Sequence, residues 1–249
     1  MPQAASNRTG AVTGDGVLVT EPHKAFGDTR ALGGLSLRAT PHEIVAIVGP
    51  SGCGKSTLLE WVCGLQSPDV GVVSSDPAAL MPQRDALLPW LSALDNAGPI
   101  MRANGIPRAE ARTAAQAHFD VFGLEGFEQA RPSELSGGMR HRVAFLRTLL
   151  SGRPVLCLDE PVGALDAITP AQMQAWLADA LTHEPRTVLL VTHDVEEAAV
   201  LADRTRAVSG WPGRVVQTLE VELRRPRDRL DSAVVELRER ALRALGSGK

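Results

Sequence analysis

Three continuous apolar runs along this chain predict a parallel β-sheet. The runs are Ile44–Val48, Val155–Leu158 and Val188–Val191, and each is rich in Val, Leu and Ile. Such runs are typical of parallel strands that are covered on both faces. The residues that follow them include Gly49, Asp159 and His193. Because ligands of open α/β sheets bind beyond the carboxyl ends of the strands, we expect these three residues to converge at one edge.

Other segments predict a small antiparallel region and several helices. From Val17 to Leu37, short alternating segments are broken by Pro and Gly, which is typical of antiparallel strands at a sheet edge. The block Leu87–Thr148 is mainly helical in pattern, with good helix formers from Pro107 to Phe122. Thr169 and Pro170 have the character of the cap and first turn of another helix.

The two ends of the chain differ in pattern. Residues 1–15 are polar and lack the apolar core of a signal peptide, so we expect a disordered leader. The segment Ala233–Leu245 is predicted to be a helix whose apolar stripe packs on the body of the protein. The predicted stripe consists of Val234, Val235, Leu237, Leu242 and Leu245.

Residues 49–56 carry the strongest chemical signal. Their sequence, Gly-Pro-Ser-Gly-Cys-Gly-Lys-Ser, has the G-x-x-x-x-G-K-[ST] pattern of a phosphate-binding P-loop between a strand and a helix. The glycines let successive N–H groups point at one anion, and the helix start adds further donors. Lys55 supplies charge for the outer phosphates, and Ser56 offers a hydroxyl to Mg²⁺. A chance glycine-rich turn is the alternative, which the agreement of all the positions disfavours.

The apolar run Val155–Leu158 leads into two carboxylates. Asp159 is placed to hold Mg²⁺ beside Ser56, and Glu160 is placed to align and deprotonate an attacking water. By itself this pattern also fits a strand end with solvated acids. Its occurrence behind a P-loop in the same chain favours the catalytic interpretation.

The segment Leu135–Met139 predicts a second anion site. Ser136 precedes a predicted helix that it could cap, and Gly137 and Gly138 leave backbone N–H groups uncovered at the helix start. Taken alone, Ser-Gly-Gly is also compatible with a flexible turn.

At these residues the chain resembles the ATP-binding cassette (ABC) ATPases. The matching motifs, in chain order, are Walker A (49–56), the Q-loop (Gln83), the signature (Leu135–Met139), Walker B (Val155–Glu160), the D-loop (Gly163–Asp166) and the switch histidine (His193). Met139 stands where Gln is commonest in the signature. Order and approximate spacing agree from Phe26 to His193.

The resemblance implies ATP and Mg²⁺ as cofactors, with Glu160 and His193 as catalytic residues. It implies nucleotide binding by Phe26, Gly49, Pro50, Ser51, Gly52, Cys53, Gly54, Lys55, Ser56, Thr57 and Gln83. It implies Mg²⁺ binding by Ser56, Gln83 and Asp159. Two copies would pair head to tail, with Ser136, Gly137 and Gly138 of one copy on the ATP of the other and Asp166 linking the two sites.

Several of these roles compete with simpler ones. Phe26 is the candidate for stacking on adenine because the chain has no Tyr, but it would also suit a hydrophobic core. Gln83 could be an exposed loop amide, and Asp166 could cap a helix. A lone His is usually structural or exposed, but His193 follows an apolar strand beside the predicted site.

The expected fold class is α/β: a P-loop NTPase parallel-sheet core, an antiparallel β edge and an inserted α-helical subdomain. Residues 16–84 and 149–215 are expected to form the nucleotide-binding core. Residues 85–148 are expected to form the helical subdomain, and 216–249 a tail made of a strand and a helix. The whole would be one ABC domain.

The amino-acid composition of the chain limits the kinds of molecule that it is expected to bind. The net charge of −3 gives no general attraction to nucleic acid, and no run of residues is long and apolar enough for a membrane helix. The count of three cysteines is odd, no metal-type spacing occurs, and neither Cys53 nor Cys157 is suited to a structural disulfide. We therefore expect a protein of the reducing cytosol that does not itself cross a membrane.

The sequence of the segment Leu87–Asn96 is similar to that of the ATP-binding subunits of importers of nitrate, taurine, alkanesulfonates and thiamine precursors. This resemblance implies two separate transmembrane permease subunits, an indirect solute-binding protein and a peripheral position on the cytoplasmic face of the cell membrane. The apolar residues around Trp90 would form a socket for a permease helix, or ordinary core packing. The alternative is a soluble ABC ATPase in assembly or nucleic-acid repair, without a membrane partner. The nucleic-acid class usually carries a long coiled-coil insertion, for which the helical block is too short.

Overall fold

The computed structural model describes residues 14–26, 29–33, 35–162, 170–210 and 213–246. The predicted leader is therefore described only from residue 14 onward. Asp166, its D-loop and the predicted cap Thr169 lie outside the described residues, as does the side chain of Phe26.

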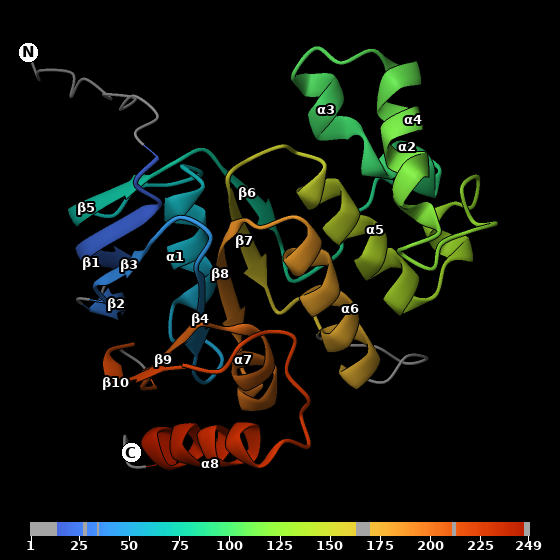
Figure 1. The fold of residues 1–249 in the computed structure, drawn as a ribbon. Coiled ribbons are helices and arrows are strands. Elements are labelled where there is room, and N and C mark those ends of the chain that lie inside the picture. Colours follow the sequence, from blue (N-terminus) through green and yellow to red (C-terminus); the bar gives the residue numbers. More distant parts are fainter. Residues whose placement is uncertain (1–13, 27–28, 34, 163–169, 211–212, 247–249) are drawn as a thin grey trace, which may run out of the picture.

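The strands form two sheets, which lie side by side in Figure 1. The antiparallel sheet contains β1 (Val17–Phe26), β2 (Thr29–Gly33), β3 (Leu37–Ala39) and β5 (Val70–Ser75). The larger sheet has the order β10 (Val215–Glu220), β9 (Arg204–Val208), β4 (Ile44–Val48), β8 (Thr187–Thr192), β7 (Val155–Asp159) and β6 (Ala78–Met81). All its pairs are parallel except β10 with β9. The antiparallel edge and the parallel core follow the predicted patterns.

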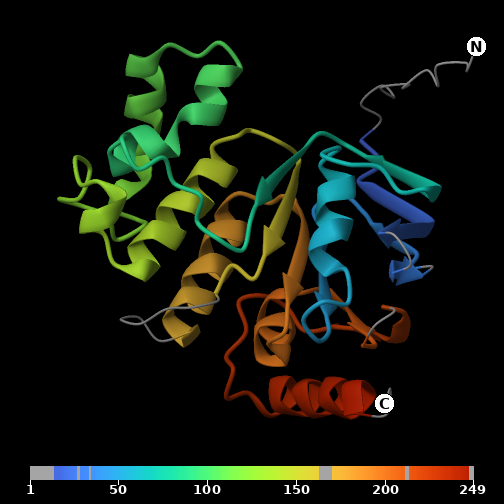
Figure 2. The ribbon, with the colours of Figure 1, turned by 180° about the vertical axis from the view of Figure 1, so that it is seen from behind.

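The helices surround these sheets (Figures 1 and 2). They are α1 (Lys55–Val62), α2 (Ala93–Ala97), α3 (Pro99–Ala103), α4 (Arg108–Phe119), α5 (Gly137–Leu149), α6 (Pro170–His183), α7 (Val195–Leu201) and α8 (Ser232–Gly246), with a 3₁₀ turn at Pro132–Glu134. Helices α2 to α4 gather at the end of the molecule remote from the antiparallel sheet, as the inserted helical block predicts. Within the described part of the chain, no helix has the length and apolarity needed to cross a bilayer.

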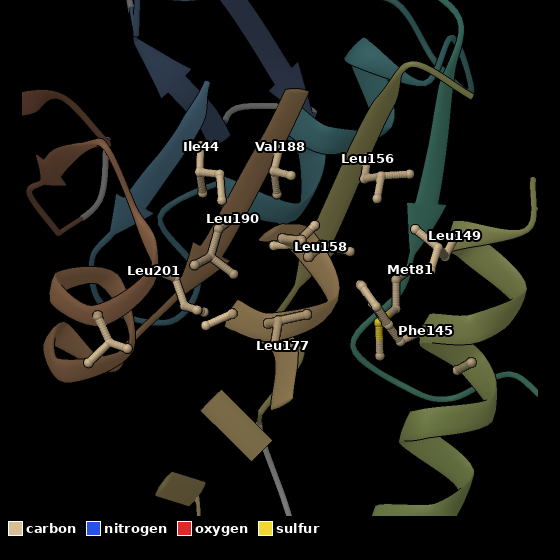
Figure 3. Packing of buried hydrophobic residues seen from close by; sticks show 14 of the residues in the cluster. Ile44, Met81, Phe145, Leu149, Leu156, Leu158, Leu177, Val188, Leu190 and Leu201 are labelled. Atoms are coloured by element: carbon tan, nitrogen blue, oxygen red, sulfur yellow. The ribbon is translucent and has the colours of Figure 1, made fainter. Parts of the chain in front are cut away.

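Both faces of the parallel strands are buried, which explains their continuous apolar sequences. In β4, Ile44, Ala46 and Val48 belong to one hydrophobic cluster, whereas Val45 and Ile47 belong to another. Figure 3 shows the first cluster, where strand residues such as Leu158 and Leu190 face helix residues such as Leu177 of α6. The second cluster lies against α1 and the antiparallel sheet. Each fully buried Leu or Ile contributes roughly 1.5–3 kcal/mol.

Strand register aligns the ends of the three central strands. Val48 of β4 lies opposite Thr192 of β8, and Asp159 of β7 lies opposite Val191 of β8. The residues that follow these strands therefore emerge at one edge, as the apolar runs predict.

A buried asparagine orders the loop that follows the Q-loop. Asn96 is fully buried in α2, and its Nδ2 donates to the carbonyls of Leu88, Leu91 and Ser92 at 3.1–3.2 Å. Its Oδ1 accepts from the Leu88 N–H at 2.7 Å. The loop backbone is thus fixed from inside, while the Trp90 side chain stays 69% exposed.

Helix α8 packs as predicted, but on a different set of residues. Its buried positions are Val234, Leu237, Ala241 and Ala244. Leu242, which the apolar stripe placed on the packed face, is 51% exposed, so that expectation was wrong. Spacing of three and four residues keeps the buried positions on one side of the helix, and Leu242 lies one step beyond that face.

Candidate active site

The loop between β4 and α1 has the backbone of an anion cradle. Gly52 and Gly54 have φ angles of 79° and 98°, in the left-handed region that favours glycine. A Cβ at Gly49 would lie 2.7 Å from the Val208 carbonyl oxygen, so the chain passes too close there for a side chain. Gly54 precedes α1 without a side-chain cap, so no cap side chain satisfies the helix's first N–H groups.

The amine of Lys55 lies over this loop. The residue is 6% exposed, and its Nζ donates to the carbonyls of Gly49 and Pro50, each at 2.8 Å. Nζ also lies 3.8 Å from Sγ of Cys53, which is buried beneath the loop. These contacts hold the charged amine of Lys55 against the loop, so that it does not extend into solvent.

Asp159 ends β7 beside the start of α1. The residue is 7% exposed, and burial raises the pKa of its carboxyl above the ordinary value. A hydrogen bond with the Ser56 side chain opposes this rise in pKa, and so does the charge of Lys55. The site therefore contains a desolvated carboxyl next to a hydroxyl, and a cation nearby would favour its ionised form.

Glu160 is held at both carboxylate oxygens. Gln83 Nε2 donates to Oε2 at 2.9 Å, and His193 Nδ1 lies 3.1 Å from Oε1. Its backbone has φ 50°, and its N–H donates to the Val191 carbonyl at 2.8 Å. A glutamate in this conformation is strained by about 1–3 kcal/mol, and such strain persists where the surroundings fix it. The strained backbone of Glu160 therefore lowers the free energy of unfolding, while the surrounding contacts keep the carboxylate in this position.

These residues line a pocket of about 290 Å³. Its lining consists of Ser51, Gly52, Gly54, Lys55, Ser56, Thr57, Gln83, Asp159 and Glu160. His193 is not among these lining residues but contacts the lining residue Glu160, and its side chain is 60% exposed. The structure therefore brings together the P-loop, the two carboxylates, the Q-loop glutamine and the switch histidine, as the sequence motifs suggest.

The three residues Ser136, Gly137 and Gly138 do not line this pocket. They form the start of α5, where Ser136 caps the helix and its Oγ accepts from the Met139 N–H at 3.2 Å. The two predicted anion sites of one chain are separate features.

Two arginines tie the Q-loop segment to α5. Arg140 Nε donates to Oδ2 of Asp85 at 2.9 Å, and its NH1 donates to the Leu135 carbonyl at 2.8 Å. Arg147 NH2 donates to the Asp85 carbonyl at 2.7 Å, and NH1 to that of Ala86 at 2.9 Å. The sequence analysis did not find the contacts with Asp85 and Ala86, because nothing local in the sequence links residues more than fifty positions apart.

The turn around His193 contains a second feature that the sequence analysis missed. The Asp194 N–H donates to Oγ1 of Thr192 at 2.9 Å, and Asp194 caps α7 by accepting from the Glu196 N–H at 2.8 Å. Glu197, in the first turn of α7, is 1% exposed. Burial raises the pKa of Glu197 to about 8, although a hydrogen bond with Thr192 acts in the opposite direction. A polar residue before an apolar helix is a cap signal that could have identified Asp194.

A glycine loop and two carboxylates at the ends of parallel strands define the P-loop class of nucleotide-binding proteins. More specifically, residues 32–163 match the ABC transporter family, which is more than half of the chain. The chain belongs to the ABC transporter family, and this confirms the resemblance to the ABC ATPases.

Individual relatives agree with this assignment. The chain is 44% identical to the aliphatic sulfonates import ATP-binding protein of Rhodococcus jostii, over 88% of this chain and 89% of the relative. It is 43% identical to the taurine import ATP-binding protein of Chromobacterium violaceum, over 84% of this chain and 82% of the relative. A dimeric ATP-binding cassette in a post-hydrolysis state bound to ADP and Pi aligns with a TM-score of 0.73 at 28% identity. That alignment covers 84% of this chain and 100% of the cassette, and it confirms the predicted fold class.

The buried Glu197 predicts a pH-dependent stability. Because its folded pKa of about 8 exceeds the ordinary value of 4.5, it stabilises the fold at low pH, and this contribution is lost as the pH rises to about 8. Glu197→Gln should therefore gain unfolding free energy relative to wild type between about pH 5 and pH 8, by on the order of 1 kcal/mol per pH unit. Denaturant unfolding at a series of pH values measures this difference, with the exposed Glu239→Gln as control. A constant difference across this range would contradict it.

Proposed function

We propose that this chain is the ATP-hydrolysing subunit of an ABC importer. The observation that carries the proposal is the Glu160 carboxylate, fixed between Gln83 and His193 at the edge of the P-loop pocket.

The P-loop would bind the phosphates of ATP. Backbone N–H groups between Gly52 and Ser56 and the start of α1 offer donors and a positive dipole end to the anion. Lys55 would transfer Nζ from the carbonyls of Gly49 and Pro50 to the outer phosphates, a short movement because it already lies over the loop. Phe26 remains the proposed stacking partner for adenine. The pocket suits the phosphate end of the nucleotide, with adenosine outside it.

The donor set beside the phosphates suits Mg²⁺, a hard cation that prefers oxygen. It comprises the Ser56 hydroxyl, the buried Asp159 carboxylate and the Gln83 amide. Because the Gln83 side chain donates its Nε2–H to Glu160, the side-chain carbonyl oxygen of Gln83 is the atom left for a metal or its water. When bound, Mg²⁺ supplies charge neutralisation at the phosphate oxygens. A nearby cation would also relieve the desolvation that raises the pKa of Asp159.

Glu160 would act as the general base. A carboxylate offers about four lone-pair positions, so one partner on each oxygen still leaves room to accept a proton from water. Gln83 and His193 hold the carboxylate in a single orientation, and this fixes where the water is activated. His193 would use its second ring nitrogen to contact the γ-phosphate. A positioned base contributes about 10²–10⁴-fold to the rate.

The second site element would come from a second copy. Ser136, Gly137 and Gly138 start a helix of 13 residues outside the pocket, so they would complete the ATP site of a head-to-tail partner. Asp166 is proposed to connect the two sites. The dimeric cassette to which the chain is similar supports this arrangement. Through Arg140 and Asp85, a displacement of Gln83 would move α5 together with the pocket.

The import role rests on relatives and on one surface. The two import ATP-binding proteins above share more than 40% identity with this chain, which supports a small sulfonate, taurine or a related compound as the transported solute. Two transmembrane permease subunits would bind the Trp90 region, whose loop Asn96 holds rigid, and a solute-binding protein would act through them. The chain would work at the cytoplasmic face of the membrane.

Glu160→Gln tests the proposed base. The amide cannot accept the water proton but keeps nearly the same shape, so ATP binding should persist while turnover falls by about 10²-fold or more. A fluorescent ATP analogue measures binding, and phosphate release measures turnover. The matched control is Glu125→Gln, at an exposed position in the helical block. Turnover at the wild-type rate in Glu160→Gln would identify another group as the base.

Ser136→Arg tests the site that two chains share. A bulky side chain at the start of α5 should spare ATP binding by one chain, because Ser136 is outside its pocket, yet prevent closure of the dimer. We expect turnover to fall by about tenfold or more. A variant that binds ATP without hydrolysing it should accumulate as the ATP-joined dimer, so Glu160→Gln with ATP should elute as a dimer from a sizing column. The double variant Glu160→Gln/Ser136→Arg should elute as a monomer. Ser133→Arg, at a nearby exposed position, is the control. Unchanged turnover and dimer formation would remove the shared site.

Co-purification tests the import role. From detergent-solubilised membranes, the chain should bring down a polytopic permease, and Trp90→Ala should lose it while keeping ATP hydrolysis in isolation. Leu230→Ala is the control, since Leu230 is 77% exposed and lies near α8, outside the loop of Trp90. Recovery of soluble partners alone would contradict the import role but not the ATPase activity.

A further inference from the structure

A cavity of about 400 Å³ lies at the amino ends of the parallel strands, away from the P-loop. His42 precedes β4 by two residues, while Arg186 and Asp203 directly precede β8 and β9. The end of α6 and the connector between β10 and α8 complete the lining with Leu181, Thr182, Pro185, Leu223, Arg224 and Arg225. Because the P-loop follows the other end of β4, a strand of roughly 16 Å separates the two sites. None of the residues in this lining has a task in the ATPase mechanism above.

Hydrogen bonds fix the backbone of this wall of the cavity. The His42 N–H donates to Oγ1 of Thr187 at 3.0 Å, and the Ile44 N–H donates to Oδ2 of Asp203 at 2.9 Å. The Asp203 N–H in turn donates to the Ile44 carbonyl at 2.8 Å. The starts of three neighbouring strands are therefore held together before any ligand binds, which lowers the entropic cost of binding one.

The lining contains three arginines and a single carboxylate, that of Asp203. Oδ2 of Asp203 accepts from NH2 of Arg225 at 3.2 Å. NH2 of Arg227, which is outside the lining, approaches Oδ1 at 3.8 Å. Since Asp203 already pairs with two arginines, it leaves the charges of Arg186 and Arg224 in excess in this cavity.

These two arginines have donors to spare. The Arg224 side chain makes no hydrogen bond or ion pair with any residue that the structure describes. Arg186 pairs with Glu184 at 3.2 Å, a partly exposed neighbour in the same loop. The Nε of Arg186 is buried and has no acceptor among the described residues. A buried donor without an acceptor destabilises a fold, and an oxyanion in the cavity would supply acceptors to both guanidinium groups.

The size and the apolar part of the lining indicate an organic ligand. Leu181, Pro185 and Leu223 give the cavity apolar surface beside the arginines. Its volume falls in the range of about 300–1,000 Å³ that is typical of small-molecule sites. A bare inorganic anion would leave most of this volume to water, whereas a short apolar body would cover the leucines.

We propose that this cavity binds a small organic oxyanion, namely a carboxylate, sulfonate or phosphate monoester on a short apolar body. The oxyanion accepts from Arg224 and Arg186, because a guanidinium fork matches two oxygens of such a group. The ring of His42 offers one further donor. The apolar body lies on Leu181 and Leu223, so the ligand joins α6 to the connector that leads to α8. The P-loop stays free for its own anion, and the site does not depend on the proposed function.

Titration of the full-length protein with hexanoate tests the site. Hexanoate has a carboxylate and a short apolar chain, whereas acetate has only the carboxylate and hexan-1-ol only the chain. At constant ionic strength, NMR of labelled leucine methyl groups should show saturable shifts at Leu181 and Leu223, and none at Leu59 in the P-loop helix. We expect a dissociation constant of about 1 mM or lower for hexanoate. Acetate and hexan-1-ol should each bind at least about tenfold more weakly, because each lacks part of the contacts.

Three variants locate the bound anion. Arg224→Glu reverses the charge at an exposed side chain and should weaken hexanoate binding by about tenfold or more. Arg102→Glu, at an exposed position in the helical block, makes the same change in net charge and should bind hexanoate as the wild type does. Lys55→Ala removes the cation of the P-loop and should also leave the affinity unchanged.

Several outcomes overturn the proposal. They are the absence of saturable shifts at Leu181 and Leu223, an unchanged affinity in Arg224→Glu, an equal loss in Arg102→Glu, and acetate or hexan-1-ol binding as tightly as hexanoate. Loss of binding in Lys55→Ala would place the anion at the P-loop and overturn it as well. None of these measurements requires ATP hydrolysis, so failure of the proposed function leaves the test of this site intact.

Discussion

The sheet edge that carries the proposed catalytic residues depends on the register of three parallel strands. Pairing of Val48 with Thr192 and of Asp159 with Val191 fixes where each strand stops. A slip of one residue would turn every side chain of a strand to the opposite face and separate Glu160 from His193. Burial on both faces makes such a slip costly, because each strand places its residues alternately in two hydrophobic clusters. The hydrophobic core and the chemistry are therefore specified by the same hydrogen-bond ladders.

Glu160 connects this rigid edge to the helical part of the molecule. Gln83 holds one oxygen of its carboxylate, and two residues further on Asp85 is bound to α5 through Arg140 and Arg147. Helix α5 is the helix that Ser136 caps. A change of charge at the pocket thus has a short covalent and hydrogen-bonded route to the helix start proposed to meet the partner's nucleotide.

The sequence was most informative where local pattern determines structure. Apolar runs predicted the strands because both faces are buried, and motif spacing predicted the P-loop, since eight consecutive residues specify its backbone. Three features were not predictable from the sequence, because tertiary contacts create them. They are the left-handed backbone of Glu160, the burial of the Glu197 side chain and the ion pair between Asp85 and Arg140. The prediction that Leu242 is buried was wrong for the same reason, because the elements packed against α8 determine which side of the helix is covered.

The strand β10 has a further consequence for how the chain tolerates shortening. It is the edge strand beside β9, which itself pairs with β4, the strand that leads into Gly49. Removing the chain from Val215 onward would leave the backbone of β9 as an unpaired template for strands of other molecules, a known route to aggregation. A truncation or a fused partner protein is therefore better placed after α8 than within β10.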